Sequence, residues 1–188
     1  MVERCANYFN AFVEVAETVN SNLRCSQVLS AVLESTARAM GAKACSIRLL
    51  SDLGRTLELK ASYGLSEQYL AKGEVVVGRS LLDADALEGR AVVIDDVASD
   101  PRIQYPGEAK AEGICSMLVV PFTLKGMVIG VMRVYMDEPH RFSDDEVEFF
   151  RAVANIGAIA YDNARRFEEM ESQFETMRRS KVPWAGRF

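Results

Sequence analysis

The sequence predicts an α+β fold in which a central antiparallel sheet is covered on both faces. Residues 113–121 and 128–135 are runs of β-branched and large apolar residues, and the polar turn expected between them, at 122–127, contains Lys125 and Gly126. This pattern favours a β-hairpin. Both runs are apolar at successive positions, which is typical of strands buried on two sides. Helical patterns near both ends of the chain can cover one face, and irregular chain is left for the other.

Two helices are expected at the N-terminal end. Apolar residues within 4–19 recur at steps of three and four, which places them on one stripe of a helix. They are Cys5, Tyr8, Phe12, Val15 and Val19. The polar residues 20–22 should interrupt this helix. A second helix begins between Ser21 and Ser26 and ends where Gly41 suits the left-handed position after a helix.

Strands and short helices alternate in the next part of the chain. Residues 44–50 and 56–63 are typical of two paired strands, the second one half-exposed because apolar and polar residues alternate in it. The segments 66–72 and 78–88 each run up to a glycine and are expected to be short helices. Residues 91–94 form a short buried strand.

The segment from 95 to 113 is polar and broken. Pro101, Pro106 and Gly107 prevent one continuous helix through it. A connection of this length inside a compact domain is more often functional than idle, because ordered loops held by a scaffold are where ligands are bound.

A long C-terminal helix should begin after Ser143. Glu146 completes a capping box with Ser143, and Phe142 with Val147 provides a hydrophobic staple. No helix breaker follows before Pro183. The apolar stripe keeps a seven-residue repeat that extends beyond what one small sheet can cover. Its positions are Phe149, Val153, Ile156, Ala160, Asn163, Phe167, Met170, Phe174 and Met177.

The far end of that stripe needs a partner. We expect a homodimer in which the N- and C-terminal helices of two subunits form a four-helix bundle, with Asn163 at a core position helping to fix the register. Otherwise the apolar residues of the stripe from Phe167 to Met177 would be exposed to solvent. The alternative is a monomer in which the two terminal helices pair within one chain.

Composition excludes several classes of function. A net charge of −5 with the charges mixed along the chain argues against a phosphate-backbone footprint, so no nucleic acid partner is expected. The start lacks the layout of a signal peptide, and no apolar run reaches the length of a membrane span, so we expect a cytoplasmic protein with no direct membrane insertion. Four dispersed cysteines without a C-x-x-C pair, and a single histidine, give no zinc-ligand spacing.

Several motifs in this order resemble the GAF domain, a sensory domain related to PAS domains. They are Tyr63-Gly64-Leu65, residues 89–96, Asp100-Pro101-Arg102, residues 113–122, residues 126–131, and Phe142-Ser143 leading into the long helix. The likeness covers residues 23–166. We therefore divide the chain into an N-terminal dimerisation helix at 1–21, a GAF domain at 22–166, and a C-terminal helix extension and tail at 167–188.

The resemblance implies a sheet with helices on one face and a small-molecule pocket, covered by loops and short helices, on the other. GAF domains commonly belong to bacterial signalling proteins, pair through their terminal helices, and pass a ligand signal along them. The implied function is sensory and regulatory rather than enzymatic, and the chain could engage a signalling partner protein.

Period-two alternation shows which strand residues share a face, and the resemblance implies which face lines the expected pocket. Arg48 shares a face with Ser46 and Leu50, and Arg133 shares a face with Tyr135. In relatives that hold a linear tetrapyrrole, the positions resembling Arg48 and Tyr135 face the chromophore. Two arginines there would suit a polar or anionic ligand. The expected ligand-binding residues are Arg48, Ile94, Asp95, Asp96, Arg102, Ile103, Tyr105, Cys115, Met117, Val119, Arg133 and Tyr135.

Other interpretations stay open beside this one. Both arginines could pair with internal acids such as Asp95 or Asp96, or reach solvent. The pocket could be degenerate, with Arg48, Met117 and Tyr135 converging on a void too small for a ligand, which would leave a dimerisation module.

The sequence does not name a cofactor. The Asn-Lys-x-Asn-Phe signature of cyclic-nucleotide binders is missing, and Cys115 is not followed by the histidine of many bilin binders. Haem would need His140, which we expect to be a solvated loop residue. An iron site from Asp95, Asp96, Asp100 and Cys115 is conceivable, but aspartates after a short strand are more often caps and turn formers.

An enzymatic alternative also comes from the resemblance. Some GAF-like proteins reduce free methionine sulfoxide with paired cysteines, which requires a reactive thiolate and a resolving partner nearby. Here only Cys115 lies near the expected pocket, and Cys45 should point to the opposite face from Arg48. Both are more plausibly small buried apolar residues.

Overall fold

The computed structural model describes residues 2–19 and 24–180. The strands are β1 (Ala44–Leu50), β2 (Thr56–Tyr63), β3 (Val75–Val76), β4 (Val92–Ile94), β5 (Ser116–Leu124) and β6 (Met127–Met136). The helices are α1 (Val2–Val19), α2 (Cys25–Met40), α3 (Glu67–Leu70), the single 3-10 turn η1 (Val77–Arg79), α4 (Leu81–Leu87), α5 (Pro106–Ala111) and α6 (Asp144–Ser180). The expected interruption at 20–22 and the breaker Pro183 lie outside the described residues.

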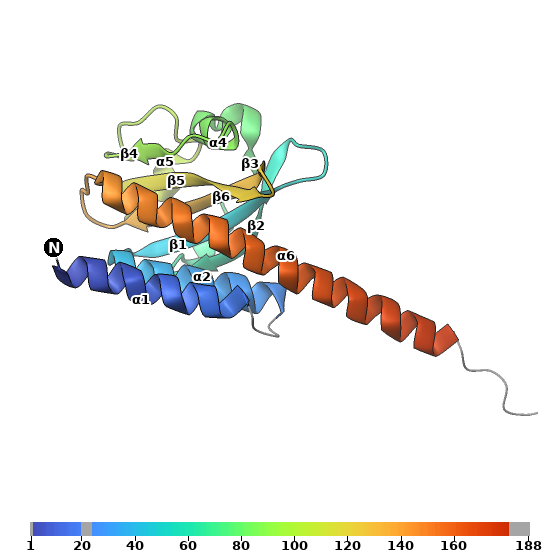
Figure 1. Ribbon diagram of the computed structural model, residues 1–188. Helices are drawn as coiled ribbons and strands as arrows, with labels where there is room; N and C mark the ends of the chain where they lie inside the picture. The colour runs from blue at the N-terminus through green and yellow to red at the C-terminus, as the bar shows by residue number, and fades with distance from the viewer. Residues whose placement is uncertain (1, 20–23, 181–188) are drawn as a thin grey trace, which may run out of the picture.

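The strands form one antiparallel sheet in the order β3-β2-β1-β6-β5-β4. The long helices α1, α2 and α6 cover one face, and α4, α5 and their loops, at the top of Figure 1, cover the other. This arrangement confirms the predicted α+β class. No helix in the described part of the chain is both long and apolar enough to cross a membrane.

Alternating side chains of the central strands divide the interior into two cores. On the helix face, Ile47, Phe122 and Met132 pack against α2 and α6. On the second face, Met117, Val131 and Tyr135 pack under α3, α4 and the chain from 92 to 114. The expectation that these strands are buried on both sides is therefore confirmed.

The central hairpin turn is shorter than predicted. Its strands run to Leu124 and from Met127, which leaves only Lys125 and Gly126, both in the left-handed region with φ of 51° and 81°. A two-residue turn of this kind matches the twist of the flanking strands. Phe122, which we had placed in the turn, is instead wholly buried on the helix face, because its large apolar side chain is more stable there than in water.

The cover of the second face, which consists of α3, α4, α5 and the loops around them and is called the roof below, contains a helix that the sequence pattern does not predict. Pro106 is the first residue of α5, where its missing N–H leaves no hydrogen bond unmade. The proline that we took only as a helix breaker therefore starts a helix. The predicted helix at 78–88 is split into η1 and α4, while Gly41 ends α2 in the left-handed conformation, as expected.

The capping box at the start of α6 is present. Glu146 N–H donates to Ser143 Oγ at 3.3 Å, and Ser143 N–H donates to Glu146 Oε2 at 2.8 Å. His140, expected to be solvated, is instead partly buried, with Nε2 3.0 Å from Glu146 Oε1. Glu146 therefore ties both the preceding loop and the first helical turn together.

The two terminal helices pair within the chain. The ring of Tyr8 on α1 stacks on Phe149 of α6 with centroids 4.2 Å apart, and Val15 is fully buried. The C-terminal half of α6 extends well beyond the domain (Figure 1). The positions of the predicted apolar stripe that are exposed along that half are Asn163, Phe167, Met170, Phe174 and Met177.

Candidate functional site

A small cavity lies between the second face of the sheet and its roof. Its walls come from α3, α4, β5, β6 and the loop before α5, and its polar side chains include Lys72, Asp83, Tyr105 and Arg133. The cavity measures about 20 Å³. A single water needs roughly 10–15 Å³ by this measure, so the space is water-sized.

Arg133 and Asp83 form a buried ion pair at the base of this cavity. Their side chains are 5% and 0% exposed, and Arg133 NH2 lies 2.5 Å from each Asp83 carboxylate oxygen. Ser80 Oγ donates a further hydrogen bond to Asp83 Oδ2. Burial alone would lower the pKa of Arg133, but the Asp83 carboxylate together with Tyr135 and Tyr69 outweighs burial and raises that pKa.

Asp83 was not among the predicted site residues. The alternative that Arg133 pairs with an internal acid is right in kind, but the acid is Asp83 rather than Asp95 or Asp96. The sequence does contain a clue to the burial of Asp83, because Asp83 lies between Leu82 and Ala86, two apolar residues on the buried side of α4. A carboxylate on that side needs a basic partner.

Arg48 is a second buried guanidinium on the same face. Its NH1 donates to the carbonyl oxygen of Leu57 at 3.2 Å, and its pKa is lowered first by burial and then by Arg133. Neither Arg48 Nε nor Arg133 Nε has an acceptor among the described residues. Buried donors of this kind usually find a partner, so the interior of the second face holds unused hydrogen-bonding capacity.

Lys72 brings a third basic group to the cavity. Its Nζ lies 3.1 Å from the centroid of the Tyr69 ring and 5.9 Å from that of Tyr105. Burial, followed by the charges of Arg133 and Arg48, lowers the pKa of Lys72 to about 6. Two guanidinium groups and Lys72 therefore share a single buried carboxylate, Asp83, because Glu108 is exposed to solvent. This arrangement favours a negatively charged guest.

Eight of the twelve predicted residues belong to this region. Arg48, Met117, Val119, Arg133 and Tyr135 point from the strands into the second-face interior. Ile94 lies in the same core, while Ile103 and Tyr105 line the cavity from the roof. Tyr135 also exchanges a 2.9 Å hydrogen bond with Ser46. Whether any of them binds a ligand stays a prediction.

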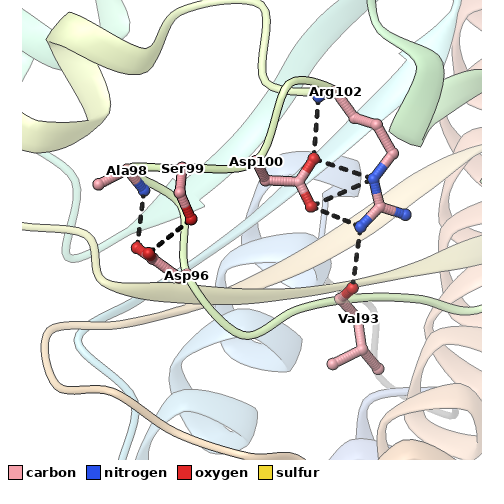
Figure 2. Close-up of polar contacts among 6 residues, drawn as sticks. All are labelled: Val93, Asp96, Ala98, Ser99, Asp100 and Arg102. Carbon is pink, nitrogen blue, oxygen red and sulfur yellow. Dashed lines mark hydrogen bonds and ion pairs between the residues drawn. The ribbon is translucent and has the colours of Figure 1, made fainter.

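The other four predicted residues do not face the cavity. Figure 2 shows Asp96 accepting hydrogen bonds from Ala98 N–H and Ser99 Oγ, the turn-forming role that we had set against a metal site. Arg102 pairs with Asp100 and also reaches Val93 O (Figure 2). The remaining two, Asp95 and Cys115, line a separate surface hollow with Asp96.

The described cysteines lie apart from one another. Cys45 is buried in the helix-face core, where burial raises the pKa of its thiol. Cys115 is partly exposed immediately before the first residue of β5, and its Sγ donates to Asp137 O at 3.1 Å. No group of three potential metal ligands converges in the described residues.

The family model for the GAF domain matches residues 24–162. This chain belongs to the GAF domain family. GAF domains are sensory domains of signalling proteins, so the match confirms the predicted family. The region matched runs from the start of α2 to the middle of α6 and contains every residue of the cavity described above.

Known proteins resemble this GAF domain over most of its length. A methyl sulfide methyltransferase-associated sensor of Methanosarcina acetivorans is 25% identical over 171 residues, which cover 87% of this chain but only 17% of that sensor. The solved GAF domain of a phosphoenolpyruvate-protein phosphotransferase from Coxiella burnetii is 22% identical, with a TM-score of 0.75, covering 87% of this chain and 98% of that one.

One solved neighbour is an enzyme. The free methionine-R-sulfoxide reductase of Neisseria meningitidis, in complex with its substrate, is 19% identical, with a TM-score of 0.71, covering 85% of this chain and 90% of that one. At this level of identity the likeness concerns the fold alone. An enzyme therefore shares the fold of this chain.

Proposed function

We propose that this GAF domain is a non-enzymatic cytoplasmic sensor whose second-face cavity binds a small anion and whose terminal helices signal within a homodimer. The observation that carries the proposal is the imbalance of buried charge under the roof, where the guanidinium groups of Arg48 and Arg133 face a single buried carboxylate, Asp83, with Lys72 beside them. A buried cation is unfavourable without a partner, and a carboxylate or phosphate could accept hydrogen bonds from a guanidinium.

Binding of anything larger than a few atoms requires the roof to move. Polar contacts join the part of the roof around α3 to the part around α5. Ser66 N–H donates to Glu112 Oε1 at 2.9 Å, and Tyr105 Oη donates to Glu74 O at 2.8 Å. Since contacts of this kind contribute little individually, a ligand that pairs the buried cations could separate them.

A path from the cavity to α6 exists in the sheet. Met117 of β5 faces the cavity, while its neighbour Leu118 packs on the helix face against α6. At the end of the same hairpin, Lys125 Nζ lies 3.5 Å from Asp162 Oδ2, and Asp162 is held by Arg165 and Arg166 as well. Movement of the strands would therefore displace the middle of α6.

The proposed homodimer rests on the exposed apolar residues of the terminal helices. Met170 and Phe174 are 62% and 70% exposed on the extension of α6, and Phe9 is 67% exposed on α1. Side chains of this size contribute about 1.5–3 kcal/mol each when they are fully buried. A second copy brings an identical stripe, so pairing the two buries both at once.

The alternative is a dimerisation module with a filled pocket, which the water-sized cavity favours. Native mass spectrometry of freshly purified protein separates the two, because it reports the subunit number and any retained small molecule together. The sensor proposal expects a dimer that carries or takes up a small anion. A dimer that takes up none of a broad panel of anions would favour the dimerisation module over the sensor. A monomer would contradict signalling through the terminal helices of a homodimer.

A further inference from the structure

The geometry points to Lys72 as a carbamylation site, where the amine adds carbon dioxide and the resulting carboxylate lies in the cavity that the guanidinium group of Arg133 also lines. This inference rests on the proposed function in so far as it uses the same cationic cavity. It goes beyond that function because it names the guest and the atom to which the guest is bonded.

The surroundings of Lys72 prepare its amine for this reaction. Nζ lies against the face of the Tyr69 ring and lines the cavity beside Arg133. Among the described residues no carboxylate lies within ion-pair distance of Lys72 Nζ, although Arg133, which also lines the cavity, has one. The ring covers one side of the amine, and the cavity leaves the other side open to a small electrophile.

The charged groups around Nζ come from four elements. Arg133 of β6 and Arg48 of β1 disfavour an ammonium ion, whereas Asp83 of α4 and Glu108 of α5 favour it, and burial outweighs them all. The pKa of about 6 leaves Lys72 largely neutral at pH 7. An exposed lysine with an ordinary pKa is neutral on the order of a thousandfold less often, and only the neutral amine attacks carbon dioxide.

The reaction balances without a further reactant. The nitrogen lone pair forms an N–C bond to carbon dioxide, one C=O electron pair moves onto oxygen, and the amine releases one proton to water. Before the reaction the neutral amine and the buried ions, which are two guanidinium groups and the Asp83 carboxylate, leave one positive charge in excess, because Glu108 is exposed to solvent. Afterwards the carbamate cancels that excess and supplies oxygen acceptors at the cavity that Arg133 lines.

The size of the cavity favours carbon dioxide over larger carbonyl compounds. The space of about 20 Å³ is closer to that of a water than to that of a metabolite. Carbon dioxide has only three atoms, and a covalent N–C bond brings the added group closer than any non-bonded contact. Its addition therefore requires the least displacement of the roof.

The experiment traps carbamates on the full chain with triethyloxonium ion, once in bicarbonate-containing buffer and once in buffer freed of carbon dioxide, and maps the ethylated product by peptide mass spectrometry. We expect the adduct on Lys72 only with bicarbonate, and ahead of every exposed lysine. Lys72→Arg should abolish it, whereas Lys60→Arg, at an exposed lysine paired with Glu58, should leave it unchanged.

Three results decide the matter. An adduct on Lys72 that appears with bicarbonate supports carbamylation, and mapping of the wild-type chain gives this answer even if Lys72→Arg does not fold. Equal labelling of Lys72 and exposed lysines, or none on Lys72, overturns carbamylation. If formate or phosphate still raises the melting temperature in that case, the anion sensor survives. If no anion does, the proposed function fails as well.

Discussion

Arg133 and Asp83 show how one buried residue can set the chemistry of a whole face. The arginine is predictable from the sequence because it alternates with Val131 and Tyr135 on a strand. Its partner is not, since Asp83 lies fifty residues away on a short helix that itself packs on β5 and β6. Only the fold brings these two residues together, and only then does the excess of positive charge become visible.

Replacing Asp83 by asparagine should destabilise the protein strongly. The change leaves Arg133 buried without its counter-ion, and breaking one side of a buried ion pair typically costs about 3–5 kcal/mol. Urea unfolding measures the loss. Added phosphate or formate should restore part of the stability if an anion can take the place of the carboxylate.

The matched control is Asp85→Asn on the same helix. Asp85 pairs with Arg90 at the surface, where its side chain is 40% exposed, and exposed pairs contribute little. A loss as large as that of Asp83→Asn would show that the helix rather than the ion pair is responsible.

At the scale of elements, the start of α6 links stability to pH through Glu146. Burial opposes the charged form of Glu146, but hydrogen bonds from Ser143 and the proximity of His140 lower its pKa below 4.5. A carboxylate with a lowered pKa in the folded state stabilises the fold above its unfolded pKa, and this stabilisation is lost as pH falls through the folded pKa.

Glu146→Gln should therefore flatten the dependence of stability on acid pH. We expect the unfolding free energy of the wild type to fall more steeply below about pH 4.5 than that of the variant, as measured by urea titrations at several pH values. Glu148→Gln, an exposed position on the same turn, should keep the wild-type slope. Identical slopes for wild type and Glu146→Gln would contradict this account.

The contact between β1 and β6 depends on the absence of a side chain at Gly130. A Cβ there would lie 2.2 Å from Arg48 O and 2.8 Å from Leu49 Cα. Gly130→Ala should thus destabilise the fold by at least about 2 kcal/mol, as read from thermal or urea unfolding. Gly78→Ala, where nothing lies within 4 Å, should change it by less than about 0.5 kcal/mol.

The elements themselves were largely predictable. Period-two and period-3.6 patterns, a capping box at Ser143 and Gly41 gave the long helices and both hairpins, because these signals are local. The roof was not, since α5 begins at a proline, and within the preceding loop Asp96 bonds to Ser99 while Arg102 bonds to Asp100. Which polar groups of a loop point inward depends on tertiary contacts that no spacing reveals.

At the scale of the whole molecule, the extension of α6 should hold two copies together. Phe174→Glu places a charge in the middle of the exposed apolar stripe and should shift the dimer toward monomer, as measured by analytical ultracentrifugation across a range of concentrations. Ser172→Glu adds the same charge two positions away, outside the stripe, and should leave the equilibrium between dimer and monomer unchanged. Equal sedimentation of both variants would contradict a dimer through α6.

The most direct test of the central claim, that the second face holds a receptor for anions, is the melting temperature of the full chain in formate, acetate or phosphate against formamide or acetamide at fixed ionic strength. An anion at about a hundred times its dissociation constant should stabilise the fold by about 2.7 kcal/mol, or roughly 5–10 °C, and the neutral amides should not. The shift should be lost in Arg48→Gln and kept in Arg90→Gln. No shift with any anion, or the same shift with the amides, would contradict the account.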